Sequence, residues 1–395
     1  MKEGWEYKRM DEVCSIARGG SPRPIKDYIT NDPNGLNWIK IGDTDMGGKY
    51  IYSTKEKIKP EGLKKSRWVE EDEFLLSNSM SFGRPYILKT NGCIHDGWLV
   101  LRDYQKYLNI DFFYYVLSSE NVQRQFRIKA QGSTVSNLNT DRVASVTIPI
   151  PPLSEQQSIV DYLDAAFAKI DAMKANAEKR LNEAKALFQA SLKKMLEPKE
   201  GWEEDTLINV FNFIDYRGAT PKKLQRGVPL VTAKNVKCGY IDYTIKDYIS
   251  KEEYETRKGR GISRKGDLLI TTEAPLGNVA IADLDEFSAG QRLITLQQYD
   301  NPKYEFINEF YYYYMLSFPF QKRINEMATG ATAQGIKAKL LKTIIVPIPP
   351  LSIQYSIVAT LDSLKSKVDR LQENYDKISQ ECDALKQAIL RQVFE

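Results

Sequence analysis

Two long stripes of apolar residues dominate the pattern of hydrophobic and polar positions. Near the end of the chain, apolar side chains recur at alternating steps of three and four from Ile357 through Leu385 to Ile389, and a weaker stripe runs from Leu163 to Met195. This is the spacing of the a and d positions of a coiled coil, and neither stripe contains proline or glycine. A helix of about 40 residues is more often part of a coiled coil than a core helix. The sequence therefore predicts two helices that pair with each other, each about 60 Å long.

The segments before these stripes have a different pattern, which predicts two globular α+β modules. Short apolar runs alternate with glycine, proline and asparagine. Leu36–Ile41, for example, precedes Gly42-Asp43, as expected for a strand followed by a loop. A Pro-Pro pair comes before each long helix, and proline keeps the residue before it extended. We therefore expect each helix to begin after the prolines, with Ser154 and Ser352 as N-caps.

The chain contains the same pattern twice. The string IPIPPLSEQQSIVDYLD matches VPIPPLSIQYSIVATLD, which sets Pro151 opposite Pro349, 198 positions further on (349 − 151). The loop RGGSP that begins at Arg18 recurs as RGATP at Arg217. Between such anchors the halves diverge strongly. One scaffold has been kept twice while the segments that it presents differ, which indicates that each half recognises something different.

Composition adds few constraints. The 395 residues suit two domains, and 42% hydrophobic and 27% charged residues are near the average for globular proteins. Without an apolar run of about 20 residues or a signal peptide, the chain is expected in the cytoplasm and not in a membrane. The four cysteines form no CxxC pair, so we expect reduced thiols rather than a metal site. The net charge of +4 and a pI near 8.5 are compatible with a polyanionic partner but do not indicate one alone.

With the paired PIPPLSxQ elements, the RGxSP or RGxTP loops and the two long helices in place, the whole chain resembles the specificity subunits of type I restriction-modification enzymes. The P-[IL]-P-P-L-x-x-Q element before a long helix is the most specific part of the match. Ile353 departs from the family's pattern. That pattern, and Glu155 at the equivalent place of the first half, would lead us to expect an acidic residue there. The resemblance implies two target-recognition domains, each similar to that of adenine-N6 methyltransferases, that read the halves of a split DNA site. The paired helices would hold them apart and dock the modification subunits.

On this interpretation the fold class is α+β, with two globular target-recognition domains related by internal duplication and separated by a long antiparallel two-helix coiled coil. The expected boundaries are 1–150 and 199–348 for the recognition domains, and 151–198 and 349–395 for the spacer helices. The chain would bind a bipartite, asymmetric double-stranded DNA target and direct adenine methylation and restriction by its partners. Those partners would be methyltransferase subunits, two of them in this family, and restriction/translocase subunits, with no cofactor held by the chain itself.

Candidate DNA contacts come from loops that occupy equivalent places in the two halves. Amide and guanidinium groups can read base edges, whereas hydroxyl, basic and backbone N–H groups can bind phosphates. Gly20 lacks a Cβ and could bring backbone close to a phosphate, and Asn137 and Gln334 could bind adenine through two hydrogen bonds. A solvated turn is the simpler interpretation of each loop alone. The candidates are, in the first half, Arg18, Gly20, Ser21, Lys40, Asp43, Ser79, Ser81, Arg84, Ser133, Thr134 and Asn137, and, in the second, Arg217, Thr220, Lys222, Lys234, Asn235, Thr272, Asn278, Thr332 and Gln334.

The motifs of catalysis are missing from the sequence. It has no (N/D)PP(Y/F) tetrapeptide, and Asp267 stands where a phosphate-binding loop spaced like Gly261–Gly266 would need lysine. The only histidine, His95, has no nucleophile to pair with, and the aromatic runs at 112–115 and 311–314 look like helix core. We therefore expect a non-catalytic DNA-binding subunit. The alternative is a structural coiled-coil adaptor with two protein-binding heads.

Overall fold

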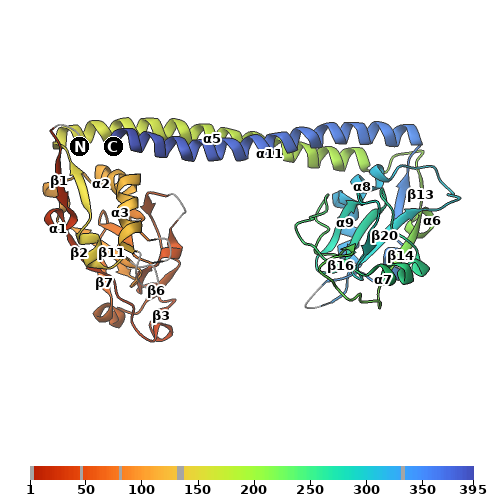
Figure 1. Cartoon of the computed structure of the whole chain (residues 1–395), viewed down its shortest axis with the longest axis horizontal. Coiled ribbons are helices and arrows are strands. Elements are labelled where there is room, and N and C mark those ends of the chain that lie inside the picture. The colour runs from red at the N-terminus through yellow and green to blue at the C-terminus, as the bar shows by residue number, and fades with distance from the viewer. Residues whose placement is uncertain (1–3, 45–47, 80–81, 131–137, 331–333) are drawn as a thin grey trace. The chain divides into compact units, whose positions relative to one another are not determined.

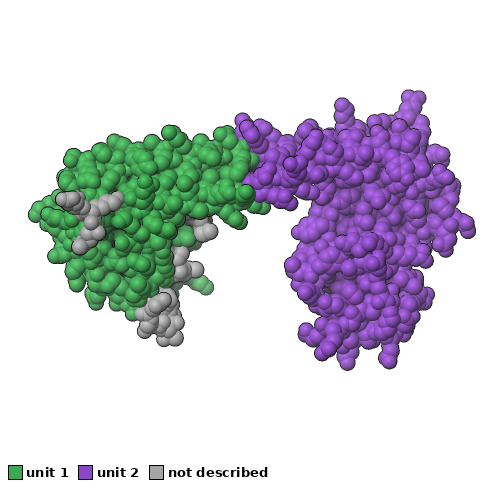
Figure 2. Space-filling model, turned by 45° about the horizontal axis from the view of Figure 1, so that its top comes forward, with its two compact units in different colours: residues 1–177, 376–395 green, residues 178–375 purple. Residues whose placement is uncertain are grey.

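The computed structural model describes residues 4–44, 48–79, 82–130, 138–330 and 334–395 (Figure 1). It contains two compact units, which Figure 2 shows in different colours: unit 1 is Met1–Ala177 with Asp376–Glu395, and unit 2 is Glu178–Tyr375. Each unit combines an α+β head with one segment of each of two long helices. None of the helices in the described ranges is long and apolar enough to cross a membrane.

The head of unit 1 is built on two five-stranded sheets, and the central strands of the first are almost wholly apolar and buried. The first has the strand order β2 (Ser15–Arg18), β11 (Trp98–Arg102), β8 (Phe74–Ser77), β9 (Pro85–Leu88), β5 (Tyr50–Ile51). The second has the order β3 (Ile29–Thr30), β6 (Glu56–Ile58), β4 (Leu36–Ile39), β10 (Gly92–Ile94), β7 (Arg67–Val69). β4 leads into a short 3-10 turn at Ile41–Asp43, so the strand and loop predicted here are confirmed.

Helices and a separate strand pair complete this head and join it to the first long helix. They are α1 (Met10–Val13), α2 (Ile110–Ser118), α3 (Glu120–Ala130), α4 (Thr140–Ala144), and the antiparallel pair β1 (Glu6–Arg9) and β12 (Thr147–Ile150). Further 3-10 turns cover Ile25–Asp27, Pro60–Lys65 and Tyr104–Lys106. Phe112 and Phe113 are fully buried against the first sheet, which confirms that the first aromatic run is core.

The head of unit 2 repeats this plan. Its main sheet has the order β14 (Phe211–Asp215), β20 (Leu293–Gln298), β17 (Leu268–Thr272), β18 (Leu276–Ile281), and its smaller sheet the order β16 (Tyr248–Ile249), β15 (Val228–Val231), β19 (Ser288–Ala289). The remaining elements are α6 (Leu207–Val210), α7 (Lys251–Arg257), a 3-10 turn at Lys258–Arg260, α8 (Asn308–Leu316), α9 (Phe318–Glu326), α10 (Ala338–Leu341), and the pair β13 (Glu203–Thr206) and β21 (Ile345–Ile348). The predicted α+β fold and internal duplication are confirmed in the described residues.

The two long helices are α5 (Leu153–Leu196) and α11 (Leu351–Phe394), each of 44 residues. Within unit 1 they run antiparallel, because Asp171 pairs with Lys386 while Lys174, further along α5, approaches Asp383, earlier in α11. Most residues of the predicted stripes are partly or fully buried, but Leu385 is 48% exposed. The alternation of threes and fours therefore located the helices correctly and was wrong about this one position.

Each long helix begins two residues earlier than the N-cap prediction requires. The helix starts are Leu153 and Leu351, and the carbonyl of Pro152 accepts hydrogen bonds from the backbone N–H groups of Glu155 and Gln156. Ser154 therefore lies inside the first turn. A proline suits the position before the helix, because it has no backbone N–H and an N–H there would have no acceptor within the helix.

A buried glutamine fastens the start of each helix to its head. In unit 1, Gln156 is fully buried; its Nε2 donates to the carbonyls of Tyr107 and Pro151, and its Oε1 accepts from the N–H of Asn109, at 2.8–2.9 Å. Gln354 repeats all of these bonds in unit 2, with Glu305, Pro349 and Ile307 as partners. The glutamine of the repeated PIPPLSxQ element is thus a clamp between helix and head.

A second repeated bond lies about two turns further along each helix. The hydroxyl of Tyr115 in α2 donates to Asp164 of α5, and that of Tyr313 in α8 donates to Asp362 of α11 at 2.6 Å. Burial, followed by the adjacent carboxylate, raises the pKa of both tyrosines, so both hydroxyls keep their proton at neutral pH. Helix and head are therefore joined at two successive points.

We predict that Gln156→Ala destabilises the chain markedly. The substitution leaves two buried carbonyls and one N–H without a partner, at a cost of about 1–3 kcal/mol for each group that water cannot reach. The neighbouring Gln157 is exposed, and Gln157→Ala should change the free energy of unfolding by less than about 1 kcal/mol. Urea unfolding followed by circular dichroism would measure both, and equal effects of the two substitutions would contradict the clamp.

Candidate DNA interface

In unit 1 the predicted RGGSP loop follows strand β2 and packs closely on its own head. The N–H of Gly19 donates to Trp98 O and that of Gly20 to Ile94 O. A Cβ on Gly19 would lie 2.3 Å from His95 O, and one on Gly20 would lie 2.7 Å from Lys65 O. The close approach of neighbouring backbone therefore explains why both positions need glycine. These contacts do not test the approach to a phosphate that was expected of Gly20.

The side chain of Asp96, in the loop between β10 and β11, gathers the groups around the RGGSP loop. Its Oδ1 accepts from the hydroxyl of Ser21 at 2.8 Å and lies 3.0 Å from His95 Nε2. Its Oδ2 lies 3.3 Å from Arg23 Nη2, and its backbone carbonyl accepts from Arg18 Nε at 2.9 Å. Asp96 thus connects two arginines, a hydroxyl and an imidazole at one end of the sheet.

Asp96 is ionised and His95 is neutral at neutral pH. Burial would raise the pKa of Asp96, but the Ser21 hydrogen bond and the charges of the nearby arginines outweigh burial and lower that pKa. Burial also lowers the pKa of His95, despite the charge of Asp96. The N–H of Gly97 donates to His95 Nδ1 at 2.9 Å, so the imidazole proton is on Nε2, which faces Asp96. The site therefore carries a fixed carboxylate among cationic groups.

The loop after strand β8 lies against the same end of the sheet. Asn78 is 1% exposed, and its Nδ2 donates to the carbonyl of Asp96, while its buried Oδ1 has no hydrogen-bond partner among the described residues. Ser79 is half-buried and Arg84 is exposed. Asn78 O also accepts from the N–H of Leu138, which follows the candidate loop 131–137. The structure thus brings the first-half candidates Arg18, Ser21, Ser79 and Arg84 to one group of loops.

Lys40 and Asp43 lie in the loop after β4 and have partners within the head. Lys40 Nζ forms an ion pair with Glu56 Oε1 at 2.7 Å. The carboxylate of Asp43 accepts from the N–H groups of Lys40 and Lys55 and so caps the 3-10 turn. Asp43 therefore has a structural role in the free chain.

In unit 2 the RGATP loop follows strand β14 in the same way. Arg217 makes a two-nitrogen ion pair with Asp215, and the hydroxyl of Thr220 donates to Gln291 Oε1 at 2.8 Å. Lys222 and Lys234 are exposed. The loop therefore presents exposed cations next to an amide, where the first unit has a carboxylate.

A buried arginine with no carboxylate partner among the described residues holds this loop in place. Arg257 is 6% exposed; its guanidinium donates to Ser288 Oγ, Ala219 O and Ala289 O and stacks on the ring of Tyr216 at 4.2 Å. Burial lowers the pKa of Arg257. One side chain thus ties the RGATP loop to strand β19, and an arginine is needed because its planar fork can donate in three directions.

Two second-half candidates are buried and occupied by protein partners. The Oδ1 of Asn235, which is 2% exposed, accepts from Thr232, and its Nδ2 donates to two backbone carbonyls. Thr272 is 3% exposed and lies on strand β17. Asn278 is half-buried, and its Nδ2 donates to Val236 O. In contrast, Gln334 is exposed. Asn235 and Thr272 therefore act in the core of the head.

Five candidates lie outside the described residues: Ser81, Ser133, Thr134, Asn137 and Thr332. Sequence reasoning missed three residues that the structure places at the site: Asp96, Gln291 and Arg257. No local motif marks them, because their roles depend on partners between 31 and 75 positions away in the chain. The only sequence signal is that Asp96 and Gln291 each stand in a short polar break between apolar runs.

The duplicated heads and their loops define a protein of the DNA-specificity class. The family model described as "Type I restriction modification DNA specificity domain" matches residues 2–183 and 199–380. Since these ranges cover most of the chain, it belongs to this family, and its role is recognition of DNA sequence, not catalysis. Among the described residues no group of His, Cys, Asp and Glu could hold a metal ion.

Individual relatives agree with this assignment. The chain is similar to the type I restriction enzyme EcoBI specificity subunit of Escherichia coli, with 23% identity over 99% of this chain and 86% of the relative. It is also similar to the putative MjaX specificity subunit of Methanocaldococcus jannaschii, with 26% identity over 95% of this chain and 90% of the relative. Two solved structures share the fold at 21% identity and cover the whole chain. One, from work on complex assembly and conformational transition of the type I R-M system, has a TM-score of 0.75 and is covered over 98%. The HsdS subunit of Thermoanaerobacter tengcongensis has a TM-score of 0.57 and is covered over 97%.

We predict that Arg257→Lys destabilises the chain by about 2–3 kcal/mol, because an ammonium group on a single stem cannot reach Ser288 Oγ and both carbonyls at once. Arg260→Lys is the matched control. Arg260 is exposed, and its side chain donates one hydrogen bond to the described residues, to Arg217 O, so its replacement should cost less than about 1 kcal/mol. Urea titration of both variants would measure the difference, and a neutral Arg257→Lys would show that the guanidinium does not hold the loop.

Proposed function

We propose that the chain is the specificity subunit of a type I restriction-modification complex and binds a split, asymmetric DNA target, with one half-site for each head. The observation that carries this proposal is one scaffold present twice with different chemistry in its loops. The bonds of Gln156 and Tyr115 in unit 1 recur with Gln354 and Tyr313 in unit 2, whereas the loop side chains differ. Two readers of one sequence would have no need for different loops.

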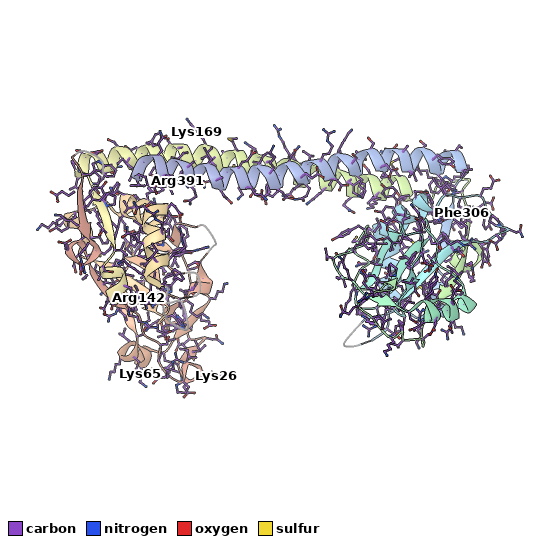
Figure 3. All side chains as sticks on the ribbon, in the orientation of Figure 1. Lys26, Lys65, Arg142, Lys169, Phe306 and Arg391 are labelled. Carbon is purple, nitrogen blue, oxygen red and sulfur yellow. The ribbon has the colours of Figure 1, made fainter. Side chains whose placement is uncertain are left out.

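The proposed DNA contacts divide into phosphate and base contacts. Exposed cations suit phosphates: Figure 3 shows Lys26 and Lys65 at the end of the first head far from the long helices, and both are exposed. Polar groups within the loops suit base edges. The candidates that we retain are Arg18, Gly20, Ser21, Lys40, Ser79, Arg84, Arg217, Thr220, Lys222, Lys234, Asn278 and Gln334, together with those outside the described residues. Asp43, Asn235 and Thr272 are not retained, because their side chains are occupied within the heads.

The partners in this proposal are two methyltransferase subunits docked on the helices and, in the full complex, restriction/translocase subunits, acting on DNA in the cytoplasm. The support is exposed apolar side chains on the long helices: Tyr162, Leu187 and Tyr355, for example, are 53%, 58% and 56% exposed. The recognition domains would be residues 1–150 and 199–348, and the spacer helices 151–198 and 349–395.

We expect that replacing residues 1–147 with the equivalent head of a relative changes one half of the methylated target and leaves the other half intact. Each head has its own core and its own loops, so each should read independently. Methylome sequencing of cells that carry the chain with its modification partner would give both targets. As a control, the purified chain alone should transfer no methyl group from labelled S-adenosylmethionine to DNA.

Three results would count against the proposal. A change in both half-sites would show that the heads do not read separately. Methyl transfer by the chain alone, with no contaminating partner, would show that it is an enzyme. Equal retention of all duplexes in a gel-shift competition would favour a structural adaptor with protein-binding heads.

We also expect the helices to set the spacing between the half-sites. Inserting seven residues after Ala177 and seven after Tyr375 adds one heptad to each helix and preserves the a and d pattern. The added length is about 10 Å at about 1.5 Å per residue, so the spacer should grow by about three base pairs at about 3.4 Å each. Insertion after Ala177 alone should lower stability, because the two helices lose register. Methylome sequencing would measure the spacer. An active double insertion with an unchanged spacer would show that the helices do not set the spacing between the half-sites.

A further inference from the structure

Asp96 in unit 1 and Gln291 in unit 2 occupy the same place in the two heads. The backbone N–H of Asn78 donates to Gly97 O, and that of Thr272 donates to Arg292 O. The strand pairing agrees, because Ser77 pairs with Trp98 and Thr271 with Leu293. Asp96 precedes Gly97, as Gln291 precedes Arg292. The two side chains are therefore structural equivalents, although the repeats of the sequence do not align them visibly.

Both side chains make the same contact with their neighbouring loop. The Ser21 hydroxyl of RGGSP donates to Asp96 Oδ1, and the Thr220 hydroxyl of RGATP donates to Gln291 Oε1, each at 2.8 Å. The hydroxyl thus holds one oxygen in each case and fixes the direction of the side chain. What differs is the second polar atom, which is a carboxylate oxygen in one head and an amide nitrogen in the other.

That second atom is available for a ligand in both heads. Asp96 is 30% exposed in its side chain, and the contact of Oδ2 with the described part of the chain is the 3.3 Å approach of Arg23, whose own side chain is 78% exposed. Gln291 is half-buried, and its Nε2 donates to none of the described residues. A side chain that is fixed at one atom is a preorganised reading group through its other atom.

The chemistry of the two atoms points to base edges rather than phosphates. A carboxylate repels phosphate oxygens, and in the major groove it can accept only from the exocyclic amino group of cytosine or adenine. The Nε2 of Gln291 can donate to N7 of adenine, and its Oε1, which has a second lone pair besides the one that accepts from Thr220, can accept from N6 of the same base. Arg18 and Arg23 beside Asp96 would offset its charge and bind the adjacent phosphates.

We propose that Asp96 and Gln291 are specificity-determining residues that read one base pair in each half-site, Asp96 through an exocyclic amino group and Gln291 through an adenine. This rests on the proposed DNA-reading function of the two heads. A purely organising role for both residues is the alternative, since each also holds its hydroxyl loop.

The test compares Asp96→Asn and Gln291→Glu, each isosteric with the native side chain, in the complex with the modification partner. Competition binding would use a panel of duplexes in which every base pair of the wild-type target is substituted in turn. Asp96→Asn should change the affinity ratio between bases by roughly 5- to 100-fold at one position of one half-site. Gln291→Glu should do so at one position of the other half-site. Asp32→Asn, an exposed acid in the same head as Asp96, should leave every ratio unchanged.

The outcomes are distinct. Weaker binding with unchanged ratios at every position means that the residues only organise their loops, and overturns the proposal. A ratio change in the wrong half-site, or at many positions together, overturns it as well. If Asp96→Asn fails to assemble, Gln291→Glu decides the matter by the same ratios. If the wild-type complex itself selects no sequence, the proposed function fails, whereas unchanged ratios in a selective complex refute only this assignment.

Discussion

A buried backbone N–H or carbonyl without a hydrogen-bond partner costs about 1–3 kcal/mol of stability. At each of two places in this chain, one glutamine side chain satisfies three such groups. Where each head passes into a long helix, the Pro-Pro segment forms no regular pairing, and the loop before α2 or α8 ends against it. Gln156 and Gln354 donate to two carbonyls and accept from one N–H there, and both are fully buried. The direction in which each helix leaves its head depends on these bonds.

The same constraint explains which parts of the two heads are alike. Beyond the glutamines, Tyr115 and Tyr313 hold a helix aspartate, and Gln123 and Gln321 each donate to a glycine carbonyl and to the end of the preceding helix. These residues satisfy buried groups, so the scaffold fixes them. The loop residues meet solvent, and the scaffold leaves them free to differ.

The loops show how different chemistry fits on one frame. A glycine-rich turn, a buried arginine or a hydroxyl can each position a loop, and the two heads use different combinations. In both heads an arginine donates to the carbonyl of the first loop residue, Arg67 to Arg18 O and Arg260 to Arg217 O. Unit 2 adds Arg257, which donates to Ala219 O and Ala289 O. The position of the two loops thus depends partly on one shared bond, while the exposed atoms of Asp96 and Gln291 differ in charge and in hydrogen-bonding capacity.

Sequence alone determined the α+β heads, the two long helices and the duplication, because hydrophobic spacing and repeated strings are local and need no knowledge of contacts. The sequence also led to the specificity family, because the PIPPLSxQ element is the most specific part of that resemblance. It did not show that the glutamine of this element is a clamp, that Asn235 is buried, or that Leu385 is exposed, because burial depends on which surfaces meet. Nor did it identify Asp96, Gln291 and Arg257, whose partners are remote along the chain. The pattern of apolar residues fixes which elements form. Only the tertiary structure decides which polar groups form hydrogen bonds within the heads and which stay accessible to a ligand such as DNA.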